Sequence, residues 1–272
     1  SSVKGTANLD TIAIGTTNGT TYETFGGNDV FTGALAALVA TGEDDTVISA
    51  GAGTADKITL SDTTLTLTDN HFTNMTGMEI LVGTSTSGAF TVTTGTAFNT
   101  AFAGGATIST GTIAASVAAS VNFQAGLANM DVTFTVDAVD MDGAAGGEDT
   151  TIVTGSGADT ITFTGDATYV GAVGDAGTIS VSSGSGIDTI SITTGTIVAQ
   201  TNSQSVIVNA GTGADVITIV SVYADTVQST ALIVIDAGDS LTTARDTLTG
   251  ADIATANLFG TGFDFSGVST VG

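Results

Sequence analysis

The 272-residue chain contains no cysteine, no proline and no tryptophan, and it has a single histidine, His71. Without cysteine the fold cannot contain a disulfide, and one histidine leaves a zinc site with too few ligands. We therefore expect His71 to be solvated or hydrogen-bonded in a polar turn. Met75 and Met78, which follow it, are expected to fill gaps in a core.

Basic residues are also scarce. Lys4, Lys57 and Arg245 stand against 27 acidic residues, and the net charge is −24. Because this charge repels phosphate backbones and anionic lipid, we expect no nucleic-acid partner. No apolar run approaches the ~18 residues of a membrane helix, so no membrane insertion is expected. The first ten residues, SSVKGTANLD, do not have the pattern of a secretion signal.

Motifs of the common catalytic sites are missing as well. The chain has no H-E-x-x-H, no G-x-S-x-G and no Walker loop. Acidic pairs of the kind that solenoid glycosidases and lyases use are plentiful, but those sites also draw on basic and aromatic side chains, and the chain has 3 Tyr and no Trp. We therefore expect that the protein is not an enzyme.

The chain is instead rich in glycine, with 37 residues, and in Thr, Val and Ile, and 42% of its residues are apolar. β-branched residues favour strands and glycine favours turns, while the apolar fraction is ample for a core. The composition therefore predicts an all-β fold.

One unit is repeated three times. It reads TIVTGSGADTITF from Thr151, TISVSSGSGIDTISI from Thr178 and SVIVNAGTGADVITI from Ser205, and a degraded copy, ALIVIDAGDS, begins at Ala231. In each unit an alternating strand meets Gly-x-Gly-x-Asp, and a second alternating strand follows. The starts are 27 residues apart. A fixed period of this size predicts a parallel β-solenoid (β-helix or β-roll) with coils of ~27 residues.

The segments GSGADTITF, GSGIDTISI and GTGADVITI resemble the nonapeptide G-G-x-G-x-D-x-U-x of RTX (haemolysin-type) secreted proteins, with Thr154, Ser183 and Ala210 in place of the first glycine. One nonapeptide per coil is most similar to the RTX-type surface-layer proteins and large adhesins of Gram-negative bacteria. The resemblance implies an extracellular protein of the bacterial cell surface whose glycine turns bind Ca²⁺. The residues expected at the metal are Gly155, Gly157, Asp159, Gly184, Gly186, Asp188, Gly211, Gly213, Asp215, Gly51, Gly53, Asp56, Asp29, Asp149, Asp236 and Asp239.

Stacking of the units places one aspartate of each turn above the next. Strand spacing of ~4.8 Å would align Asp159, Asp188 and Asp215 in a column, and two charges at that distance repel by about 3.5 kcal/mol at an effective dielectric of ~20. Calcium accepts carboxylate, carbonyl and water oxygens in irregular geometry, so it is the cation that we expect there. The alternative is that these residues are only turn formers that bond their own backbone.

The N-terminal half contains the same elements in looser form, in FGGNDVF with Asp29 and in DTVISAGAGTADKITL with Gly51, Gly53 and Asp56. We expect an irregular β-rich half over residues 1–145 and a regular solenoid over 146–272, with a boundary inside 130–150.

Three functions remain open. The first is a structural protein that self-assembles into a calcium-held surface layer or filament, with other copies of the chain and cell-surface polysaccharide as partners. The second is a calcium-binding module of a large RTX adhesin, or the non-catalytic tail of a secreted enzyme. The third is a Thr-rich face that binds ice, suggested by Thr64, Thr66, Thr68, Thr91 and Thr93. Because the repeats do not align Thr-x-Thr in the sequence, the third is not favoured.

Both ends of the chain have strand character. Leu9, Ile12 and Ile14 alternate near the start, and Phe263 and Phe265 alternate near the end without a proline. Unguarded strand edges pair with other chains, and a contact that does not close produces a filament or a sheet. We therefore expect assembly through these ends.

Overall fold

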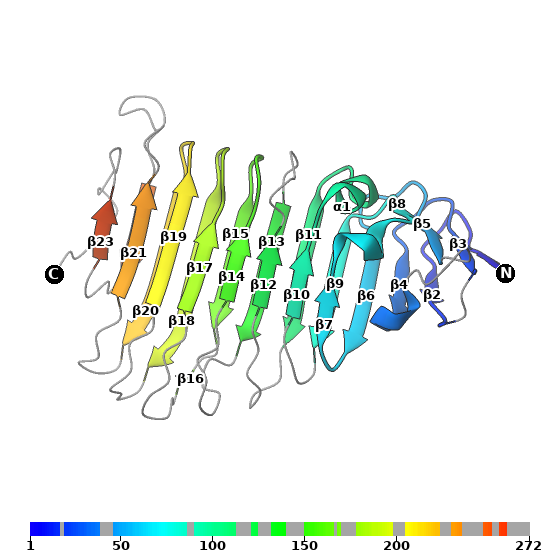
Figure 1. The fold of residues 1–272 in the computed structure, drawn as a ribbon, viewed down its shortest axis with the longest axis horizontal. Helices are drawn as coiled ribbons and strands as arrows, with labels where there is room; N and C mark the ends of the chain where they lie inside the picture. The colour runs from blue at the N-terminus through cyan, green and yellow to red at the C-terminus, as the bar shows by residue number, and fades with distance from the viewer. Residues whose placement is uncertain are drawn as a thin grey trace.

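The computed structural model describes residues 1–16, 19–38, 46–85, 90–112, 121–124, 132–139, 150–165, 168–169, 178–197, 205–223, 230–235, 247–251 and 256–259. These residues form an elongated parallel β-solenoid, in which successive coils add strands to sheets that follow the long axis (Figure 1). No helix in this part of the chain is long and apolar enough to cross a membrane. The all-β solenoid predicted from the sequence is confirmed.

The strands belong to three sheets. The 11-stranded sheet contains β2 (Thr11–Ala13), β4 (Val30–Gly33), β6 (Lys57–Asp62), β9 (Ile80–Ser85), β11 (Ala106–Thr112), β13 (Val132–Val139), β15 (Thr160–Gly165), β18 (Thr189–Ile197), β20 (Val216–Tyr223) and β22 (Thr247–Ala251), with β16 (Thr168–Tyr169) beside β18. The 8-stranded sheet contains β7 (Leu65–Leu67), β10 (Phe90–Thr93), β12 (Val121–Gln124), β14 (Thr150–Val153), β17 (Thr178–Ser182), β19 (Ser205–Gly211), β21 (Thr230–Ile235) and β23 (Ala256–Phe259). The 4-stranded sheet contains β1 (Ser2–Lys4), β3 (Thr21–Glu23), β5 (Val47–Ser49) and β8 (Met75–Thr76).

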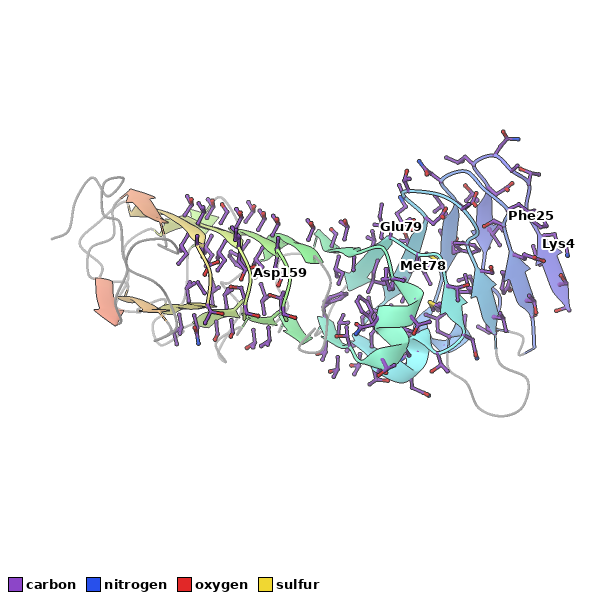
Figure 2. The ribbon with its side chains drawn as sticks, turned by 90° about the horizontal axis from the view of Figure 1, so that it is seen from above. Lys4, Phe25, Met78, Glu79 and Asp159 are labelled. Carbon is purple, nitrogen blue, oxygen red and sulfur yellow. The ribbon has the colours of Figure 1, made fainter. Side chains whose placement is uncertain are left out.

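Two sheets face each other, and their inward side chains form the core (Figure 2). The alternation of the second strand of each repeat decides which side chains enter it, because successive residues of a strand point to opposite faces. Ile161, Ile190 and Ile217 are fully buried and pair with one another across β15, β18 and β20. Each such side chain stabilises the fold by about 1.5–3 kcal/mol when it leaves water. Like residues therefore stack on like along the axis.

The second face of the solenoid changes sheet between β6 and β9. Here β7 begins the 8-stranded sheet and β8 ends the 4-stranded one, with the 3₁₀ turn η2 (Asp69–Phe72) between them. The short helix α1 (Thr96–Ala101) packs beside this turn, and a second 3₁₀ turn, η1 (Leu35–Ala37), precedes this region. Phe72 meets Phe98 edge to face with centroids 5.0 Å apart, and Phe98 stacks on Phe102 at 4.5 Å. This aromatic cluster fills the space where the two sheets exchange.

The histidine and the methionines near this turn lie where the sequence predicts. The Nδ1 atom of His71 accepts a hydrogen bond from the Thr68 backbone N–H at 3.0 Å, which closes the turn. Met75 and Met78 are buried in the core. The hydrogen-bonded histidine and the gap-filling methionines are confirmed.

The coil length varies, and this changes the register that the repeat starts imply. The buried hydroxyl of Thr154 donates to the carbonyl oxygen of Ser183, 29 residues on, whereas the Ser183 hydroxyl donates to Ala210, 27 residues on. Ile152 accordingly pairs with Val181 and not with the residue 27 positions later. The step between the first and second copies is therefore 29 residues and not the 27 that the repeat starts imply, while the strands on either side stay paired.

The register agrees with the expectation about Thr-x-Thr. On the 11-stranded sheet Thr160 pairs with Thr189 and Thr162 with Ser191, but Thr189 pairs in turn with Val216, so the three repeats do not keep Thr-x-Thr. Strands on both sides of 130–150 belong to the same two sheets. The boundary placed there stays a prediction.

Candidate functional site

In most coils an acidic residue occupies the position just before the strand of the 11-stranded sheet. In the N-terminal part this position is occupied in turn by Asp10, Asp29, Asp56 and Glu79. The register places Ala106 and Val132 at the next two positions, where the acidic series stops. It resumes with Asp159, Asp188 and Asp215. We call these two series the N-terminal and C-terminal carboxylate columns.

In the N-terminal column each carboxylate accepts the backbone N–H of the preceding member. The amide of Asp10 donates to Oδ1 of Asp29 at 2.8 Å, and the amide of Asp29 donates to Oδ1 of Asp56 at 2.7 Å. The amide of Asp56 donates to Oε2 of Glu79 at 2.8 Å. At the start of the column the carboxylate of Asp10 instead accepts the amide of Thr6 in its own turn, at 2.6 Å.

The C-terminal column repeats this arrangement. The amide of Asp159 donates to Oδ1 of Asp188 at 2.9 Å, and the amide of Asp188 donates to Oδ1 of Asp215 at 2.8 Å. All three residues are buried; Figure 2 labels Asp159. These two bonds join neighbouring coils, whereas the bond of a simple turn former joins an aspartate to its own turn.

The second carboxylate oxygen has a different environment. In Asp29, Asp56 and Asp188 the Oδ2 atom is buried and has no hydrogen-bond partner among the described residues. A buried polar atom without a partner costs about 1–3 kcal/mol, and more when it is charged. Each of these three carboxylates therefore needs either a proton on its Oδ2 atom or a cation beside that atom.

Burial raises the pKa of two of these carboxyl groups. For Asp188 the loss of solvation is the largest cause of the raised pKa, and the charge of Asp159 adds to it, while the hydrogen bond from the Asp159 amide and the nearby Ser183 side chain oppose the rise. For Asp56 burial also raises the pKa most, with the Asp29 amide opposing it and the charges of Glu79 and Asp29 adding to it. In the folded chain both groups hold a proton more readily than an exposed aspartate.

The glycine turns stack directly on one another. The amide of Ser185 donates to the carbonyl oxygen of Gly155 at 3.1 Å, and the amide of Thr212 donates to that of Gly184 at 2.9 Å. Gly186 has φ of +146°, and a Cβ atom there would overlap the Gly157 carbonyl. Glycine is therefore required by the positive φ and by the close approach of the coils.

The residues that replace the first glycine of the nonapeptide have a structural role of their own. Thr154 and Ser183 are buried, and their hydroxyls donate to carbonyl oxygens of the next coil at 3.0 and 2.8 Å. Thr24 makes the same contact to Ala50 at 2.6 Å. A row of hydroxyl bonds thus runs parallel to the carboxylate columns.

The structure gathers most of the predicted site residues in these turns. Those inside the described ranges are Gly155, Gly157, Asp159, Gly184, Gly186, Asp188, Gly211, Gly213, Asp215, Gly51, Gly53, Asp56 and Asp29. Asp149, Asp236 and Asp239 lie outside the described residues. Asp10 and Glu79 belong to the N-terminal column although the glycine motif did not find them. Their signal was an acidic residue immediately before an alternating strand.

The donor atoms of the columns suit calcium in chemistry. The Oδ2 atoms of Asp29, Asp56 and Asp188 are hard oxygen donors without a hydrogen bond, and calcium takes 6–8 such oxygens. Among the described residues no three acidic or histidine side chains gather around one point. These three aspartates are thus the residues through which the columns would hold calcium, and carbonyls and water would have to supply the remaining ligands.

No family model, curated protein or solved structure matches the chain.

Proposed function

We propose that the chain is a non-catalytic structural protein of the extracellular bacterial surface, which assembles with its own copies into a calcium-stabilised layer or filament. The observation that supports this proposal most is the pair of buried carboxylate columns in a parallel solenoid. Within each column the carboxylates link one coil to the next, and their oxygens without a hydrogen bond are the natural place for a cation. The resemblance of the glycine turns to RTX surface-layer proteins supports the same function.

Calcium has two roles in this proposal. At the bare oxygens of Asp29, Asp56 and Asp188 it offsets the cost of a buried charge. On the surface it reduces the repulsion within a chain of net charge −24, which would otherwise oppose contact between copies. Folding and assembly are therefore both expected to depend on calcium.

The first coil supplies a surface for assembly. The 4-stranded sheet ends at β1, and the 11-stranded sheet ends at β2. Among the described residues no strand pairs with the outer edge of β1 or β2, and the backbone N–H and C=O groups of such an edge can pair with another strand. A second copy that adds a strand to each sheet would extend the solenoid without a change in its geometry.

Electron microscopy of the purified chain, with and without millimolar calcium, tests the proposal. We expect ordered polymers in calcium, monomers in EDTA, and loss of polymers when residues 261–272 are removed. Melting curves measured alongside separate the two parts of the proposal. A chain that is stabilised by calcium but stays monomeric is a module of a larger adhesin, and a chain whose melting and assembly both ignore calcium contradicts the proposal.

A further inference from the structure

The N-terminal carboxylate column ends where the second face of the solenoid changes sheet. Each strand of the 4-stranded sheet is followed, in its own coil, by one acid of this column: β1 by Asp10, β3 by Asp29, β5 by Asp56 and β8 by Glu79. The 4-stranded sheet stops at β8, and the register places Ala106 and Val132 at the next two positions of the column. The column is therefore as long as this sheet.

The C-terminal carboxylate column lies beyond the change of sheet. Its members Asp159, Asp188 and Asp215 follow β14, β17 and β19, which belong to the 8-stranded sheet. Three strand spacings of ~4.8 Å separate Glu79 from Asp159, so the two columns are ~14 Å apart. Figure 2 shows Glu79 among the N-terminal coils and Asp159 among the C-terminal ones. The chain of carboxylate–amide hydrogen bonds cannot cross this gap, because the residues at the two positions between the columns have no carboxylate.

Apolar packing joins the coils in the gap. Phe72 belongs to the coil of β9, and Phe98 and Phe102 belong to the coil of β11. The Phe72 ring lies 5.0 Å from the Phe98 ring and 6.0 Å from the Phe102 ring, between centroids, and all three side chains are fully buried. Leu81 and Ile108 are also fully buried and pair across β9 and β11. None of these contacts requires an ion.

We propose that calcium controls the two ends of the solenoid separately, and that the coils of β9 and β11 form a joint that stays folded without the ion. This inference rests on the proposed binding of calcium at the columns. The buried Oδ2 atoms of Asp29 and Asp56 lie on one side of the joint, and that of Asp188 lies on the other. Sites more than about 7–10 Å apart that share no partner act nearly independently. Release of calcium from one column therefore loosens that end of the solenoid alone.

Hydrogen exchange of the full-length chain, followed by mass spectrometry in EDTA and in calcium, tests the inference segment by segment. Asp56→Asn and Asp188→Asn form a matched pair, because each keeps an oxygen for the amide of the preceding column member and removes one charge. We expect Asp56→Asn to reduce the slowing of exchange by calcium at least about tenfold in β3–β6, and to leave it unchanged in β17–β20. Asp188→Asn should do the reverse. In EDTA the amides of β9 and β11 should exchange more slowly than those of either column.

Two results would overturn the inference while calcium binding itself stands. Either variant could abolish the slowing in both segments, which would make the solenoid one calcium-dependent unit. Alternatively, β9 and β11 could exchange rapidly in EDTA and be protected by calcium together with the columns. If calcium slows exchange in no segment of the wild-type chain, the proposed function fails and the inference fails with it. Asp29→Asn is a second variant of the N-terminal column and should reproduce the result of Asp56→Asn.

Discussion

Replacement of Asp188 separates the hydrogen-bond role of a column from its calcium role. The Asp188 carboxylate accepts the amide of Asp159 at 2.9 Å, and its other oxygen has no hydrogen-bond partner among the described residues. In Asp188→Ala the Asp159 amide becomes a buried donor without an acceptor, which costs about 1–3 kcal/mol. Asp188→Asn keeps an oxygen for this amide and removes the charge, so in EDTA we expect a change of less than about 1 kcal/mol.

In calcium, unlike in EDTA, we expect Asp188→Asn to be clearly less stable than the wild-type chain. A ligand present at 100 times its Kd stabilises a fold by about 2.7 kcal/mol per site, and the amide variant loses the charged oxygen of its rung. Thermal melting followed by circular dichroism, in EDTA and in calcium, measures both effects. In a chain of this size, each kcal/mol moves Tm by about 2–4 °C. Ile187→Ala is the control, because this side chain in the same turn is 64% exposed.

Two outcomes would refute the reasoning. If Asp188→Ala melts with the wild-type chain in EDTA, the inter-coil hydrogen bond contributes no stability. If Asp188→Asn gains as much as the wild-type chain from calcium, this rung does not bind the ion.

The remaining predictions concern pH and packing. In EDTA, acidification from neutral pH towards about pH 4 should raise Tm, because the raised pKa values of Asp56 and Asp188 let the folded state take up protons that the unfolded state does not bind. In calcium the same acidification should lower Tm, since protons displace the ion. The prediction is wrong if Tm changes equally with pH in EDTA and in calcium. It is also wrong if the double variant Asp56→Asn/Asp188→Asn shows the same dependence of Tm on pH as the wild-type chain. Gly83→Ala should lower the free energy of unfolding by about 1–3 kcal/mol, because its Cβ would overlap the Phe90 ring. Gly104→Ala has open space around its Cβ and should leave the free energy of unfolding nearly unchanged. Urea titrations of both variants measure the difference.

Local pattern was sufficient to predict the type of fold and much of the candidate site. Alternation within DTITF and DTISI identifies the residues that enter the core, because strand geometry sends successive side chains to opposite faces. The glycines stand at a constant distance in sequence from Asp159, Asp188 and Asp215, so these aspartates occupy the same position in successive coils. Both inferences use spacing within a few residues, which loops elsewhere in the coil do not alter.

Contacts between coils decided the rest. Three features follow from the pairing of segments that are far apart in the sequence. They are the 29-residue step between Thr154 and Ser183, the pairing of Thr162 with Ser191, and the place of Asp10 and Glu79 in the N-terminal carboxylate column. A coil can absorb extra residues at its rim for a small cost in loop entropy, so its length does not determine its register. The partner of each carboxylate is likewise an amide of the neighbouring coil. Such a partner exists only once the coils are stacked, because strand pairing and not chain order brings the two groups together.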